Sequence, residues 1–200
     1  MRFEKWQALG NDYLIVEEPV DAATVRALCD RHTGVGADGV LVLQPPDAPG
    51  FVARLRIFNP DGGEAELSGN GAREAIMFLH RRGWTDARQF SIQTVAGEIR
   101  PTILDERTCR VDMGRARLGI DGEVEGFRFQ QVFVGNPQCA IRVGSVTELE
   151  ALDLPAIVRI ENWSPLAHPR RCRYMSASRA PLPDSSASLP SGLKMRRFAT

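Results

Sequence analysis

Two kinds of hydrophobic periodicity run along the chain, and each predicts a different type of element. Residues 51–58 alternate arginines with leucine and isoleucine, which is typical of a strand with one face in water. Residues 40–43 are apolar and follow a glycine-rich turn, so a strand is predicted there as well. Residues 70–82 place apolar side chains at positions i, i+3, i+4 and i+7, the pattern of an amphipathic helix. We expect this helix to be the best formed in the chain.

Weaker patterns predict the remaining elements. A helix is predicted at 21–31, where Asp21 can cap the N-terminus, and a last helix at 149–160. Strands are predicted at 1–7, 13–16, 90–94, 97–103, 109–113, 132–134 and 139–143, with turns at 10–12 and 59–63. The sequence therefore predicts an α+β fold, a mostly antiparallel or mixed sheet wrapped around the central helix.

The C-terminal part differs in composition from the rest. Residues 164–200 hold seven Lys and Arg against one acid, so their net charge is +6 and residues 1–163 carry −6, because the whole chain is neutral. This part is rich in serine and proline and shows neither alternation nor a helical stripe. Such a segment buries too little apolar surface to offset the entropy of ordering. We therefore predict a folded body at 1–162 and a low-complexity, disordered tail at 163–200.

Bulk composition argues against several classes of protein. The neutral charge gives no reason to expect a nucleic-acid partner or a membrane surface, and no apolar run reaches the length of a bilayer-spanning helix. The N-terminus lacks the apolar segment of a signal peptide. The cysteines form no CxxC pair, which predicts neither a metal site nor a disulfide framework and fits a reducing cytoplasm. They are Cys29, Cys109, Cys139 and Cys172.

Chemistry is suggested first by the stretch 66-ELSGNGARE-74, where glycines precede the central helix. Free N–H groups at a helix start favour an anion, and glycine lets a ligand approach the backbone closely. A carboxylate or phosphate would suit Gly69 and Asn70. The alternative is a plain turn in which Ser68 caps the helix. Local sequence leaves both interpretations open.

Asparagines in turn contexts form the second candidate feature. An Asn side chain offers a donor and an acceptor without charge, which suits the ammonium and carboxylate of an amino acid. Asn beside Gly, Pro or Asp is also ordinary turn chemistry, so each one taken singly favours a structural role. The residues concerned are Asn11, Asn59, Asn70 and Asn136.

Together, these motifs resemble those of the diaminopimelate epimerase family. The matching phrases stand in the family's order and cover roughly residues 1–162: 9-LGNDY-13, 31-RHTGVGADG-39, 56-RIFNPDGGEAE-66, 69-GNGAR-73 and 134-VGNPQC-139. The resemblance implies a cofactor-independent isomerase of lysine and peptidoglycan biosynthesis that interconverts LL- and meso-diaminopimelate. It further implies a cytoplasmic protein with a small amino-acid substrate, and a homodimer is compatible with it.

The resemblance also implies an architecture and a site. Family members have two similar lobes, each wrapping a sheet around a central helix, and the second would begin near residues 130–162. Donors at two helix N-termini bind the substrate carboxylate, and two cysteines, one per lobe, serve as thiolate base and thiol acid. By this pattern the substrate-binding residues are Asn11, Asn59, Gly69, Asn70 and Asn136, and the first catalytic position is Ser68.

Three positions depart from the family pattern. Ser68 stands where the family has its first cysteine, and a helix start cannot make a hydroxyl as acidic as a thiol. Gly39 stands where a glutamine often contacts the substrate. Gln138 stands where a histidine would tune the catalytic thiol, and glutamine cannot titrate.

Beyond Asn162 the expected motifs of a second lobe are missing. No GAGET-like segment and no cysteine before a second glycine-rich helix start are present. A frameshifted or truncated reading frame would produce this change, and an evolved tail is the alternative. We therefore expect weak or no epimerase activity from this chain alone. The alternatives are a phenazine-pathway type of isomerase with the same fold, or a non-catalytic amino-acid-binding lobe.

Overall fold

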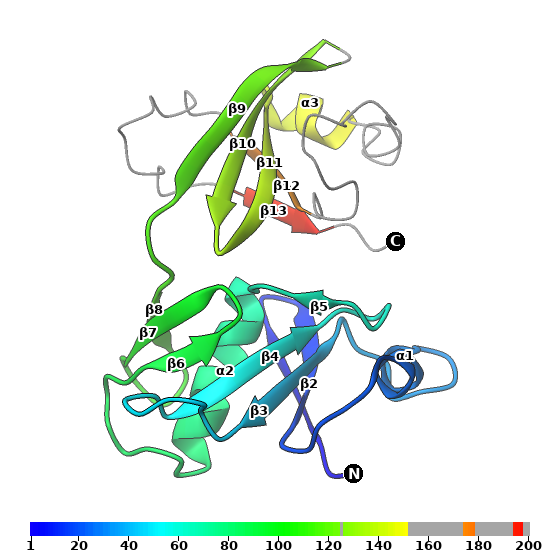
Figure 1. The fold of residues 1–200 in the computed structure, drawn as a ribbon. Coiled ribbons are helices and arrows are strands. Elements are labelled where there is room, and N and C mark those ends of the chain that lie inside the picture. The colour runs from blue at the N-terminus through cyan, green and yellow to red at the C-terminus, as the bar shows by residue number, and fades with distance from the viewer. Residues whose placement is uncertain (125, 152–173, 179–193, 198–200) are drawn as a thin grey trace. The chain divides into compact units, whose positions relative to one another are not determined.

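The computed structural model describes residues 1–124, 126–151, 174–178 and 194–197, which fall into two units, 1–114 and 115–200 (Figure 1). The sequence analysis expects a second lobe to begin near residues 130–162, and this stays a prediction. The second unit begins with a strand at Arg117–Val124, which the hydrophobic pattern did not reveal and which pairs with the strand that follows it. None of the described helices has the length and hydropathy needed to cross a membrane.

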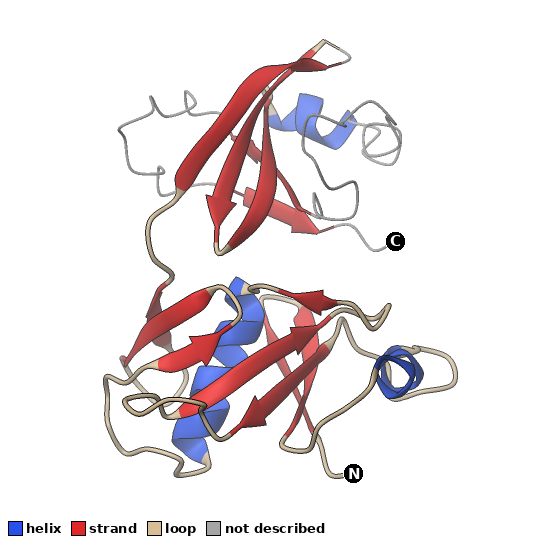
Figure 2. Cartoon of the chain, in the orientation of Figure 1, coloured by secondary structure: helices blue, strands red, loops and turns tan. Residues whose placement is uncertain are grey.

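The first unit is a mixed sheet with two helices, which confirms the predicted α+β fold (Figure 2). The sheet order is β1-β2-β3-β4-β6-β7-β8, with β5 beside β4; β2–β3 and β4–β6 are parallel and the other pairs are antiparallel. The elements are β1 (Glu4–Ala8), β2 (Asn11–Val16), α1 (Ala22–Cys29), β3 (Val40–Gln44), β4 (Ala53–Phe58), β5 (Glu64–Ala65), α2 (Gly69–Arg81), β6 (Ile92–Thr94), β7 (Gly97–Ile103) and β8 (Cys109–Asp112).

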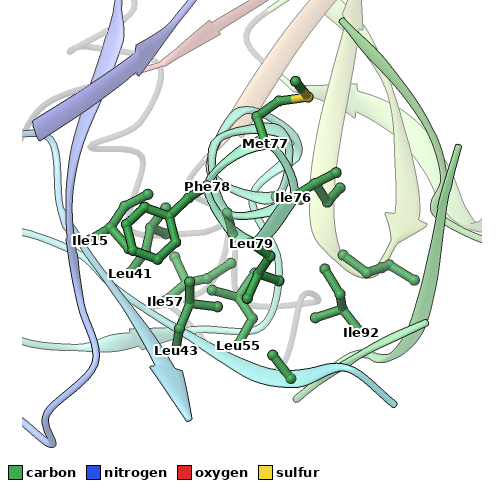
Figure 3. Packing of buried hydrophobic residues seen from close by; sticks show 14 of the residues in the cluster. Ile15, Leu41, Leu43, Leu55, Ile57, Ile76, Met77, Phe78, Leu79 and Ile92 are labelled. Carbon is green, nitrogen blue, oxygen red and sulfur yellow. The ribbon is translucent and has the colours of Figure 1, made fainter. Parts of the chain in front are cut away.

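Helix α2 is the predicted central helix, and the sheet curls around it. In Figure 3, Leu79 points towards Leu55 and Ile57 of the sheet, and the ring of Phe78 lies beside Ile15 and Leu41. Burying one such aliphatic side chain stabilises the fold by about 1.5–3 kcal/mol. Gly83 (φ 69°) follows the last turn and ends the helix, as the sequence predicted. The buried residues of α2 are Gly71, Ala72, Glu74, Ala75, Ile76, Met77, Phe78 and Leu79.

Helix α1 covers the other face of β2 and β3. Val25 and Cys29 of α1 pack against Leu14, Val40 and Val42, in a second cluster of buried residues. Strand β3 is therefore buried on both faces, which explains why its residues are apolar without alternation. Asp21 caps α1 by accepting the N–H of Thr24 (2.7 Å), as predicted.

The second unit contains a sheet of order β13-β12-β11-β10-β9, in which only β11–β12 is parallel among the described pairs. Its elements are β9 (Arg117–Val124), β10 (Phe127–Val134), β11 (Asn136–Arg142), α3 (Val146–Ala151), β12 (Tyr174–Ser178) and β13 (Lys194–Arg197). Helix α3 begins before the helix predicted at 149–160, whose remainder lies outside the described residues.

Strands β12 and β13 fall in the region 163–200, for which the sequence predicted no regular structure. Strand β12 extends the sheet at the free edge of β11, and β13 then pairs with β12. Backbone pairing to an existing sheet edge does not require an alternating sequence, so composition does not reveal it. The prediction of disorder for the rest of this region concerns residues outside those described.

Candidate functional site

The topology of the first unit brings several predicted site residues to one end of the sheet. Leu14 of β2 pairs with Val40 of β3, and Val40 pairs with Phe58 of β4. Asn11 opens β2 just before this level, and Asn59 directly follows β4. The short strand β5 then leads into α2, and the N-cap residue of that helix, Ser68, hydrogen bonds to Tyr13 of β2.

Ser68 caps the N-terminus of α2, as the sequence predicted. Its backbone is extended (φ −134°, ψ 121°), and its Oγ accepts the N–H of Gly71 (3.2 Å). The N–H groups of Gly69 and Asn70 have no acceptor among the described residues. Both residues are half-buried. The helix start therefore offers two backbone donors and the positive end of the helix dipole to an anion.

A second hydroxyl lies against Ser68. The hydroxyl of Tyr13, in β2, donates to Ser68 Oγ at 3.1 Å, and Tyr13 is only 1% exposed. Sequence reasoning did not single out Tyr13, because 55 positions separate it from Ser68. The sequence offers one local indication of a role for Tyr13: it is a tyrosine at a core position, two residues after the candidate Asn11.

The Asn70 side chain has a fixed orientation. Arg73, one turn further along α2, donates from Nη1 to Asn70 Oδ1 (2.8 Å) and to the Gly69 carbonyl (3.3 Å). With Oδ1 occupied, Asn70 presents its amide N–H₂ as a donor. Donor groups and the positive charge of Arg73 thus gather at the start of α2, which suits a carboxylate or phosphate.

Asn11 is held from behind by a network of charges. Its Nδ2 donates to Asp38 Oδ2 (2.6 Å), and Arg31 bridges Asp38 and Asp12 (3.0 and 2.7 Å). Lys5 also contacts Asp12 (3.1 Å). Partial burial of the Asp12 carboxyl opposes ionisation, but hydrogen bonds and charges from Arg31 and Lys5 outweigh it and lower its pKa to about 2.

Asn59 stabilises the turn that it opens. Its N–H donates to the carbonyl of Gly63 (2.9 Å), its Nδ2 reaches the same carbonyl (3.3 Å), and its carbonyl accepts the N–H of Gly62 (2.9 Å). The side chain is 5% exposed. Turn chemistry, the alternative that the sequence left open, therefore applies to these groups of Asn59. Asn136 belongs to the second unit, where it opens β11 and pairs with Val134.

Glu74, on the buried face of α2, is unusual among the acids of this region in its burial and its raised pKa. It is 2% exposed, and neither carboxyl oxygen has a hydrogen-bond partner among the described residues. Burial raises its pKa to about 8, and the negative charge of Asp12 adds to the shift. The N–H groups of Tyr13 and Ala8 oppose the shift, although neither is placed to complete a hydrogen bond to the carboxyl. Glu74 is thus a buried neutral acid near pH 7.

The described cysteines do not supply a thiolate at Ser68. Cys29 is buried at the C-terminal end of α1, and Cys139 is buried in the second unit. Cys109 of β8 is half-buried, and burial raises the pKa of its thiol in spite of the nearby charge of Arg73. Within the described residues no group of three or more His, Cys, Asp and Glu side chains could hold a metal ion.

Comparison with known sequences identifies relatives. The sequence model of the diaminopimelate epimerase family matches residues 3–119. A diaminopimelate epimerase from Desulforudis audaxviator is 41% identical over 167 residues, covering 70% of this chain and 59% of the relative. One from Pelotomaculum thermopropionicum is 37% identical over 199 residues, covering 86% and 69%. This chain thus spans between about half and two thirds of the length of such relatives.

Solved structures with the same fold are more distant in sequence. A probable proline racemase from Agrobacterium radiobacter has a TM-score of 0.65 at 15% identity, over 88% of this chain and 65% of the other. A phenazine biosynthesis protein of the PhzF family from Bacillus anthracis has a TM-score of 0.59 at 14% identity, over 88% and 64%. At this identity the similarity concerns the fold, and it agrees with the predicted epimerase-like lobe.

Proposed function

This chain belongs to the diaminopimelate epimerase family, and we propose that its first unit is the carboxylate-binding half of a cofactor-independent amino-acid epimerase. The substrate class is an α-amino acid, with diaminopimelate as the expected member, and the reaction is inversion of its α-carbon between the LL and meso forms. The observation that carries the proposal is the start of α2, where unpaired N–H groups of Gly69 and Asn70 adjoin the Asn70 amide.

The chemistry requires electrostatic help at the carboxylate. Removing an α-proton beside a carboxylate places negative charge on its oxygens, and fixed N–H donors stabilise that charge. Loss of one such donor costs about 10²–10³-fold in rate in enzymes that use them. The α2 dipole and Arg73 act in the same direction. Asn11 and Asn59 would bind further polar groups of the substrate.

A proton acceptor at the α-carbon is the missing part. Ser68 occupies the family's cysteine position, yet its oxygen already accepts hydrogen bonds from Gly71 and Tyr13. Glu74 is buried and neutral near pH 7, so it is a poor base. We therefore propose that the chain alone binds its substrate and inverts it slowly or not at all. A non-catalytic amino-acid-binding lobe is the second candidate function, favoured by the same observation at Ser68.

Exchange of the α-proton of diaminopimelate with solvent deuterium, followed by NMR, tests this proposal. We expect binding with exchange at no more than the background rate, because general acid–base help is worth about 10²–10⁴-fold per group and both groups are absent from the proposed site. Ser68→Cys is expected to restore slow one-face exchange at most, without epimerisation. Fast epimerisation by the unmodified chain would contradict the proposal.

Two further properties complete the proposal. No disulfide joins the described cysteines, which lie far apart in the chain. This fits a reducing compartment, and we propose the cytoplasm. A homodimer stays a prediction from the family resemblance.

A further inference from the structure

The hydrogen bonds of Ser68 are nearly complete before any ligand arrives. A serine hydroxyl has two lone pairs and one proton. Both lone pairs of Ser68 Oγ are used, one by the N–H of Gly71 (3.2 Å) and one by the hydroxyl of Tyr13 (3.1 Å). The proton of Ser68 is the remaining group, and it can only be donated.

The ring of Tyr13 has little freedom to leave this position. It is buried in the main core, 1% exposed. A Cβ atom at Gly39 would lie 2.6 Å from Cε1 and 3.0 Å from Cδ1 of the Tyr13 ring, and against the carbonyl of Phe58. The ring therefore occupies the space that any side chain at position 39 would need. Gly39 thus permits the placement of the Tyr13 hydroxyl beside Ser68.

We propose that Tyr13 is a positioning residue, which holds Ser68 as a hydrogen-bond donor to the carboxylate bound at the start of α2. The inference rests on the proposed function for its ligand, but the Tyr13–Ser68 contact stands on geometry alone. Tyr13 fills the lone pair that Ser68 would need to accept a substrate proton. The Ser68 hydroxyl then joins the N–H groups of Gly69 and Asn70 in binding the carboxylate.

The contact itself can be tested without a ligand. In Ser68→Cys, the introduced sulfur would receive the same two donors, so its thiolate is stabilised; its pKa is measured from thiolate absorbance against pH. Adding Tyr13→Phe keeps the ring and removes the hydroxyl, and we expect the thiol pKa to rise by about one unit, because the thiolate loses one of its two hydrogen bonds. An unchanged thiol pKa would overturn the positioning role.

A matched control removes a different buried hydroxyl. Thr94 is 8% exposed and donates to the carbonyl of Gly97 (2.7 Å) in the β6–β7 turn. Thr94→Val in the Ser68→Cys background is expected to leave the thiol pKa where it was. An equal rise there would show a general loosening of the fold, and it would overturn the specific role of Tyr13.

The donor role is tested by calorimetric titration of the full chain with diaminopimelate. Ser68→Ala is expected to weaken binding about 10-fold, and Tyr13→Phe about 3-fold, because a freed hydroxyl is less well oriented. In the Ser68→Ala background, Tyr13→Phe should have no further effect, since the two residues act through one hydrogen bond. Additive losses would overturn the inference.

A ligand without carboxylates separates this inference from the proposed function. With 1,5-diaminopentane, which keeps the amines and lacks the carboxylates, Ser68→Ala is expected to change nothing measurable. If the unmodified chain does not bind diaminopimelate, both the proposed function and the donor role of Ser68 fail. The thiol pKa then still reports on the Tyr13 contact by itself, so the two failures are distinguishable.

Discussion

Two carboxyl groups, those of Asp12 and Glu74, lie on opposite faces of β2 and have opposite surroundings, and the charge of Asp12 raises the pKa of Glu74. Asp12 faces the side of α1, where Arg31 and Lys5 neutralise it, and its pKa is lowered to about 2. Glu74 comes from α2 on the other face, is 2% exposed and has no hydrogen-bond partner among the described residues; its pKa is raised to about 8.

The difference shows how the same functional group can either strengthen or weaken a fold. Asp12 ties β2 to the segment that carries Arg31 and Asp38, and through Asp38 it fixes Asn11. Glu74 contributes no such link and is tolerated because it can stay protonated. Burying an unpaired charge costs several kcal/mol, whereas a neutral acid costs much less. The charged network of Asp12, Arg31 and Asp38 that supports Asn11 is therefore stable over a wide pH range. Helix α2, in contrast, contains a pH-sensitive residue.

The largest expected effect follows from Glu74→Gln. The pKa of Glu74 in the folded protein lies above its unfolded value, so the folded chain retains a proton between pH 4.5 and about 8 that the unfolded chain releases. Its contribution to stability is complete below pH 4.5 and is lost as the pH rises towards 8. A shift of one pKa unit corresponds to about 1.4 kcal/mol, so the loss amounts to a few kcal/mol.

Glutamine cannot ionise, so we expect Glu74→Gln to remove most of this pH dependence and to be more stable than the unmodified chain at pH 9. Urea unfolding, followed through the amide NMR signals of α2 at pH 5, 7 and 9, measures it. Glu66→Gln is the control, because Glu66 precedes α2 on the same segment and is half-buried. Parallel pH profiles for Glu74→Gln and the unmodified chain would refute the buried-acid interpretation.

Asp12→Asn should have the next largest effect and the opposite pH dependence. The pKa of Asp12 is lowered from 3.8 to about 2, so its contribution is present above pH 3.8 and is lost as the pH falls through 2. At pH 7 the substitution is expected to destabilise the fold by about 1–2 kcal/mol, less than the full pKa shift because Arg31 is half-exposed.

Because the charge of Asp12 also raises the pKa of Glu74, Asp12→Asn should lower that pKa as well. A direct titration of the Glu74 carboxyl by carbon-13 NMR in both proteins checks the coupling. An unchanged Glu74 titration would mean that burial alone produces the shift.

The sequence predicted features that depend on local order and missed those that depend on contacts across the fold. Apolar periodicity placed α2 within one residue of its observed bounds, and serine before glycines predicted the cap. Strand β9 was missed because Gly119 and Gly122 interrupt its pattern. These glycines make room for β10: a Cβ at Gly122 would lie 3.0 Å from the ring of Phe129, and one at Gly119 would meet Gln131.

The candidate site shows the same division. Ser68, Gly69 and Asn70 are consecutive, so their role at a helix start can be inferred from sequence. The contact of Tyr13 with Ser68 and the burial of Glu74 depend on how β2 packs against α2, which no local pattern specifies. The sequence also gave no sign that Asp38 and Arg31 support Asn11, because charged residues beside glycine turns are usually solvated.

The smallest expected effect is that of Lys5→Met, which tests how much the ion pairs of Asp12 depend on the exposed Lys5. Lys5 Nζ lies 3.1 Å from Asp12 and 2.6 Å from the carbonyl of Gly36, and its side chain is 41% exposed. Exposed ion pairs contribute about 0–1 kcal/mol and are screened by salt, so the loss should be small at 50 mM salt and smaller still at 1 M. Arg31 makes a bidentate contact with Asp12 (3.2 and 2.7 Å) and would then provide most of the stabilisation. Urea unfolding at the two salt concentrations measures this, with Arg31→Met as the comparison. A loss of stability for Lys5→Met as large as that for Arg31→Met would show that the two cations contribute equally to pairing with Asp12.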